Sequence, residues 1–143
     1  MKNTANNKPI GYANLYPFTL YVANGNTNLS DYFDFYYTTT DQRNDEKIEN
    51  FEPHRPGCYA VTFLVREKKT RNVGALIVLY DAQGSTLAHE SIHYADAVYD
   101  YLRMNGEGYD SGNEQYAYLV TWCYEQLEDY LKCNKKRVRK TTE

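Results

Sequence analysis

Residues 58–66 read CYAVTFLVR and residues 73–80 read VGALIVLY. Both runs are rich in β-branched and apolar residues, which is the composition of β-strands. The charged segment 67–72 separates them, so the two runs predict a β-hairpin. The second run is apolar throughout, and this indicates a strand covered on both faces and therefore central in its sheet.

The pattern on either side of the hairpin predicts the remaining elements. Residues 16–23 alternate apolar and polar positions, as a half-buried strand does. A short helix is predicted over 30–35 and a polar loop over 38–56. Apolar residues at helical spacing predict a helix over 87–104 and a second one from about 111 to 133.

Each predicted helix has an expected apolar face. In the first helix this face consists of Ala88, Ile92, Ala95, Tyr99 and Leu102. In the second it consists of Ala117, Val120, Tyr124, Leu127 and Leu131. Strands first and helices afterwards predict an α+β domain with a twisted N-terminal sheet of about three or more strands. We expect a flexible arm at 1–14, one domain at 15–133 and a basic tail at 134–143.

Composition excludes several classes of protein. The 143 residues suit one domain, and 16 tyrosines exclude an intrinsically disordered chain. No apolar run reaches the length of a membrane span, and no signal peptide precedes the first strand. Three cysteines without paired spacing indicate reduced thiols. We therefore expect a cytoplasmic protein that does not enter the membrane.

The C-terminal tail concentrates positive charge in a chain of net charge −3. Residues 135–140 read KKRVRK. Such a run can contact nucleic acid, but it contains no aromatic side chain on which bases would stack. The alternative is a solvated tail with lysines near a helix C-terminus. This run is the only sequence feature that favours nucleic acid, so we do not expect nucleic acid as a partner. The sequence leaves the oligomeric state open.

The motif H-E-x-x-H occupies residues 89–93 of the first predicted helix. Histidines at i and i+4 lie on one helix face, where both imidazoles can bind one Zn²⁺. Glu90 lies on the neighbouring flank and suits the general base of a metallopeptidase. The histidine face continues with Asp96 and Asp100, either as partners of the site or as ordinary exposed carboxylates.

A catalytic zinc site needs a third protein ligand and an open fourth position. The candidate is Glu114, 21 residues after His93 and in the first turn of the second predicted helix. An antiparallel return of the chain would bring its carboxylate to the histidines. The alternative is that Glu114 closes a capping box with Ser111.

HExxH followed about twenty residues later by Asn113-Glu114-x-x-Ala117 is similar to the gluzincins, which include thermolysin-like proteases and M1-type aminopeptidases. The size resembles the small single-domain zincins often encoded by phages and mobile elements, in which case the host cytoplasm or a virion is the expected location. The resemblance implies a zincin-like fold with His89, His93 and Glu114 as zinc ligands. It also implies Glu90 as catalytic base.

A small zincin needs a local donor for the developing oxyanion. Tyr118 occupies the position where thermolysin-like enzymes have an aspartate, and we expect Tyr118 to be this donor. Tyr109, between the two helices, is an alternative, and a structural tyrosine is the competing interpretation for each, which the 16 tyrosines of the chain favour. His54, the remaining histidine, lies in a polar loop and is expected to be exposed.

The sequence thus predicts a zinc metallopeptidase that hydrolyses peptide or protein substrates. The alternative is a non-enzymatic protein on a zincin scaffold, for interaction or virion assembly, with a structural or inactive zinc site.

Overall fold

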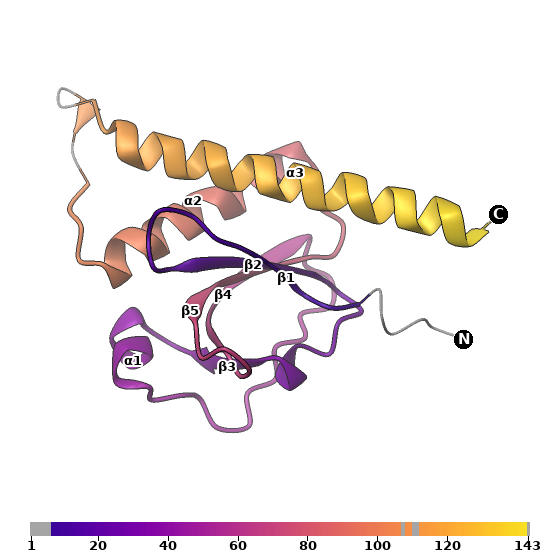
Figure 1. Ribbon diagram of the computed structural model, residues 1–143, viewed down its shortest axis with the longest axis horizontal. Helices are drawn as coiled ribbons and strands as arrows, with labels where there is room; N and C mark the ends of the chain where they lie inside the picture. Colours follow the sequence, from indigo (N-terminus) through magenta and orange to yellow (C-terminus); the bar gives the residue numbers. More distant parts are fainter. Residues whose placement is uncertain (1–6, 107, 110–111, 143) are drawn as a thin grey trace.

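The computed structural model describes residues 7–106, 108–109 and 112–142, with the backbone alone for 134–142. Five strands form one mixed sheet in the order β1-β2-β5-β4-β3 (Figure 1). The strands are β1 Ile10–Tyr12, β2 Thr19–Asn24, β3 Phe33–Tyr36, β4 Ala60–Glu67 and β5 Val73–Leu79. β2 and β5 are parallel, and the other neighbours are antiparallel.

The predicted hairpin is confirmed. β4 and β5 pair antiparallel, from Ala60 opposite Leu79 to Arg66 opposite Val73. β5 is buried along its whole length and lies in the middle of the sheet, between β2 and β4. Its unbroken apolar sequence follows from this position, because both of its faces contact a hydrophobic cluster.

Two long helices cover one face of the sheet (Figure 1). They are α2, Gly84–Tyr101, and α3, Glu114–Thr142. Side chains of β2 and β5 on this face pack against both helices. On the other face, Phe35 of β3 packs against Phe51 and Phe63. The chain is therefore α+β, as predicted.

The buried faces of the helices match the expected ones in part, since Ala95 and Tyr99 of α2 and Leu127 of α3 are buried as predicted. In α2, Ala88 is exposed and Ile92 is 46% exposed, whereas the buried residues include Leu87, Tyr94 and Val98. Tyr94 can be fully buried because its hydroxyl donates to the Phe18 carbonyl at 2.8 Å. In α3, Ala117 is exposed, and the buried side chains are Leu119, Cys123, Leu127 and Tyr130.

The segment between β2 and β4 differs from its prediction in two ways. The helix expected over 30–35 is a single 3-10 turn, Leu29–Asp31, followed by β3, because Phe33 and Phe35 point into the core at strand spacing. The expected loop contains α1, Thr39–Asn44, which starts where the Thr38 hydroxyl accepts the Asp41 N–H at 3.0 Å.

Helix α1 is attached to the sheet through Gln42. This side chain is fully buried, and its amide donates to the carbonyls of Val65 and Gly74 at 3.0 and 2.9 Å. A polar side chain in this segment thus binds strand backbone, although the sequence alone indicates a solvated loop.

Both ends of the domain also differ from expectation. Residues 10–12, expected within the arm, form β1, because they pair with residues 20–22 of β2. Helix α3 extends to Thr142, beyond the end expected near Cys133. Residues 1–6 of the arm and the side chains of the basic tail lie outside the described part of the chain.

Gly74 is required where β2 and β5 approach each other. A Cβ at this position would lie 2.1 Å from the carbonyl oxygen of Thr19, which is backbone and cannot rotate away. We expect Gly74→Ala to lower the free energy of unfolding by about 3 kcal/mol and Tm by roughly 10 °C. Thermal denaturation followed by circular dichroism measures this effect. Gly108→Ala is the control, because no atom lies within 4 Å of the added methyl group, and an equal Tm loss there would contradict the assignment.

The three cysteines occupy two different environments. Cys58 and Cys133 are exposed, whereas Cys123 is buried, and burial raises the pKa of its thiol to about 12. Since the thiolate is the reactive form, Cys123 should stay unreactive at neutral pH while the exposed thiols react readily. Titration with a disulfide reagent, native and then in urea, should show Cys123 reacting only after unfolding. Rapid native labelling of Cys123, identified by peptide mapping, would contradict this packing.

Candidate functional site

The H-E-x-x-H motif lies in the second and third turns of α2, as predicted. His89 and His93 are both exposed on the face of the helix that is not packed into the core. Their Nε2 atoms lie 3.0 Å apart, with ring centroids separated by 4.7 Å. The two imidazoles therefore point toward one place in space.

This donor pair fits two ligands of a zinc ion. With Zn–N bonds of about 2.0–2.1 Å and tetrahedral angles, two ligand nitrogens lie roughly 3.3 Å apart. The observed separation is close to that value. It also suits an N–H···N hydrogen bond between one protonated and one unprotonated Nε2. Both arrangements bring the same two nitrogens together.

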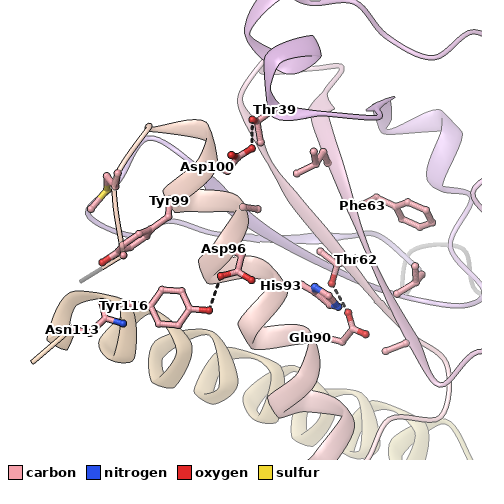
Figure 2. A pocket seen from close by; sticks show the side chains of 16 residues that line it. Thr39, Thr62, Phe63, Glu90, His93, Asp96, Tyr99, Asp100, Asn113 and Tyr116 are labelled. Atoms are coloured by element: carbon pink, nitrogen blue, oxygen red, sulfur yellow. Dashed lines mark hydrogen bonds between the residues drawn. The ribbon is translucent and has the colours of Figure 1, made fainter. Parts of the chain in front are cut away.

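Glu90 is on the neighbouring flank of the same helix turn, against the sheet. Its side chain is only 5% exposed, and one carboxylate oxygen, Oε2, accepts a hydrogen bond from the Thr62 hydroxyl of β4 (Figure 2). The sequence places Glu90 on the flank of the histidine face, and the structure adds that strand β4 holds it.

A groove of about 880 Å³ runs between α2 and β4. Glu90, His93 and Asp96 line it from the helix side, and residues 60–64 line it from the strand side (Figure 2). His89 lines a second hollow of about 400 Å³ that also reaches Glu90, next to Cys58. Glu90 thus lies where the two cavities adjoin.

The strand wall of the groove has a free edge. β3 pairs with residues 64–67 of β4, whereas β5 pairs with residues 60–66 on the other side. Within the described part of the chain, no strand pairs with residues 60–63 on the β3 side. Residues 60–64 of β4 all line the groove. Because successive residues of a strand point to opposite faces of the sheet, a groove lined by all five follows the edge of the strand.

Two hydrogen bonds between side chains that line the groove connect α2 to two other helices. Tyr116 of α3 donates to Asp96 at 2.7 Å, and Thr39 of α1 donates to Asp100 (Figure 2). Burial, followed by the bond to Asp96, raises the pKa of Tyr116 to about 12. This phenol therefore remains protonated and able to donate throughout the neutral pH range.

Tyr118 is placed away from the histidines, which corrects the expected oxyanion donor. Its side chain is 70% exposed and lines a different cavity, of about 620 Å³, with residues 13–16 and Trp122. Two residues are about 200° apart around a helix, so the groove receives Tyr116 instead. The sequence analysis does not single out Tyr116, Thr62 or Thr39, which also line the groove. What the sequence shows of them is that each side chain carries a hydroxyl group that can form a hydrogen bond.

Glu114 begins α3 and is exposed, and it does not line the groove beside His93. Among the described residues, no three His, Cys, Asp or Glu side chains are grouped to hold one metal ion. The structure thus brings together the two histidines and leaves Glu114 apart from them. Ser111, the expected capping partner of Glu114, lies outside the described residues.

The other expected residues lie elsewhere. Tyr109 is almost fully exposed, and it does not line the groove. His54 is exposed, as predicted, and contacts the ring of Tyr80 at a centroid distance of 6.1 Å.

Comparison of the chain with known protein families, with curated proteins and with solved structures found no match. Helices long and apolar enough to cross a membrane are absent from the described part of the chain.

Proposed function

We propose that this protein is a zinc-dependent peptide hydrolase with its active site in the groove between α2 and β4. The observation that carries the proposal is the position of the H-E-x-x-H side chains: the two histidine Nε2 atoms lie 3.0 Å apart, and Glu90 lies beside them in the wall of a groove. A charged side chain such as Glu90 is rarely buried without a specific role, and two histidines paired by chance on a helix surface would not account for its burial.

His89 and His93 are the proposed zinc ligands, and Glu114 is the proposed third. Bound zinc would supply Lewis acidity that polarises the scissile carbonyl and activates a water. Glu114 starts α3, the helix whose Tyr116 already contacts α2. To reach the histidines, its first turn would have to rotate by a large angle, because Glu114 and Tyr116 lie on different sides of the helix.

Glu90 is the proposed general base and acid. Its carboxylate takes a proton from the attacking water, and the same proton passes to the leaving amine when the peptide bond breaks. Burial beside the groove keeps the carboxylate close to the substrate path. Tyr116, a protonated phenol in the same groove, replaces Tyr118 as the candidate donor to the developing oxyanion, and its hydroxyl would have to leave Asp96 to make that bond.

The free edge of β4 supports a peptide as the substrate class. An extended chain can pair with unpaired strand residues as an added strand, so that main-chain hydrogen bonds hold it in one register. Residues 60–63 provide such an edge along the groove, beside Glu90 and His93. A bound peptide would therefore pass the proposed catalytic side chains.

A non-enzymatic role on the same scaffold is the second candidate. The observation that favours it is the exposure of Glu114, which leaves two histidines as the grouped ligands. The test is metal analysis of freshly purified protein, followed by mass spectrometry of a broad peptide library after incubation. Stoichiometric zinc with cleaved peptides supports the hydrolase. Zinc without cleavage, and a biological role that survives Glu90→Gln, supports the second candidate.

A further inference from the structure

Thr62 is a polar residue on an otherwise apolar stretch of strand face. On β4, the neighbours that share its face are Ala60 and Leu64, and both pack against the core that contains α2. Val61 and Phe63 point to the opposite cluster. Valine has nearly the same shape as threonine and would satisfy packing alone, so the hydroxyl needs a separate explanation.

That hydroxyl donates to Oε2 of Glu90 across the boundary between β4 and α2 (Figure 2). A glutamate has three rotatable side-chain torsions, and a hydrogen bond to one oxygen restricts all of them together. With Oε2 on Thr62, the orientation of the other carboxylate oxygen is set as well. Glu90 lines the groove, so this orientation determines how its carboxylate meets a substrate.

We propose that Thr62 is a positioning residue, which orients Glu90 for proton transfer and does not itself touch the reacting atoms. This inference rests on the proposed hydrolase function. It explains why a residue within the free edge of β4 is a threonine. It also means that β4, and not only the H-E-x-x-H motif of α2, contributes a residue to the proposed active site.

A merely structural bond between β4 and α2 is the competing explanation, and a matched pair elsewhere in the chain separates the two. The Tyr36 hydroxyl of β3 donates to Asp45 at the end of α1. This is also a bond from a strand hydroxyl to a carboxylate, and Tyr36 is buried outside the groove. Tyr36→Phe removes it without touching the proposed site.

The experiment compares Thr62→Val, Thr62→Ser and Tyr36→Phe with the wild type for zinc content, Tm, kcat and KM on one cleaved peptide. Thr62→Val should lower kcat about 10–100-fold, the usual effect of losing an outer-shell partner. Zinc content and KM should stay near wild type. Thr62→Ser should restore most of the lost kcat, and Tyr36→Phe should lower Tm while leaving kcat unchanged. Crystal structures should show the Glu90 carboxylate displaced in Thr62→Val and native in Thr62→Ser.

Two results would overturn the assignment in distinguishable ways. If Glu90→Gln is inactive but Thr62→Val keeps the wild-type kcat, or loses only Tm as Tyr36→Phe does, Thr62 is structural and the hydrolase proposal stands. If Glu90→Gln is as active as the wild type, the hydrolase proposal itself fails and the role of Thr62 fails with it.

Discussion

His93→Ala is expected to remove zinc from the protein, from about one ion per chain to nearly none. The imidazole supplies one of two nitrogens that lie 3.0 Å apart, and the remaining histidine cannot hold the ion at that point alone. The affinity loss should exceed the roughly 10–100-fold that follows loss of an outer-shell partner. Because His93 is exposed, the substitution should change the free energy of unfolding by only about 0.5 kcal/mol.

The measurement is elemental analysis of freshly purified protein, together with a zinc titration. His54→Ala is the matched control, because the third histidine is exposed and lines a different hollow from the histidine pair, so this variant should keep its zinc. Wild-type protein without stoichiometric zinc, or His93→Ala that retains it, would remove the basis of the proposal.

Glu114→Gln in the same series tests the third ligand. Loss of zinc would assign Glu114 as a ligand and would show that the first turn of α3 moves when the metal binds. Retention of zinc would exclude Glu114 and would leave the histidine pair as the grouped ligands of this chain.

Glu90→Gln is expected to keep zinc and fold but to lower kcat by about 10²–10⁴-fold. Glutamine has the same size as glutamate, and its amide oxygen can still accept the Thr62 hydroxyl, so the buried contact survives. What the amide cannot do is take a proton from water at neutral pH. The loss should therefore appear in kcat rather than in metal content.

Kinetics on one cleaved peptide, together with zinc analysis and Tm, check this prediction. Glu125→Gln, an exposed change on α3, serves as the control for an unspecific effect of removing a carboxylate. An active Glu90→Gln enzyme would mean that another group transfers the proton.

The strand pattern was readable from the sequence because β5 and its hairpin partner carry continuous β-branched apolar runs. Such residues have few alternatives to burial in a sheet. The short elements were not readable in the same way. Helix α1 depends on the Gln42 amide bonding the carbonyls of Val65 and Gly74, and β1 depends on pairing with β2, so both need partners distant in the chain.

The helix faces show the same limit. Hydrophobic periodicity predicts buried apolar residues and exposed polar ones, but α2 buries Glu90, Ser91 and Tyr94 and exposes Ile92. Tyrosine, serine and glutamate can be buried only where a specific partner accepts or donates a hydrogen bond. Ser91 donates to Leu87 within the helix, Tyr94 donates to Phe18 just before β2, and Glu90 accepts from Thr62 on β4. Two of these three partners are therefore far from α2 in the sequence.

The sequence by itself determined the α+β class, the central hairpin and the H-E-x-x-H helix with two histidines on one face, because hydrophobic periodicity and i, i+4 spacing act locally. Only the tertiary structure decided that Glu90 is bound by Thr62, that Tyr116 rather than Tyr118 meets the groove, and that the edge of β4 beside it is free. These depend on the rotation of each helix about its axis and on strand register, which arise from packing between segments far apart in the chain.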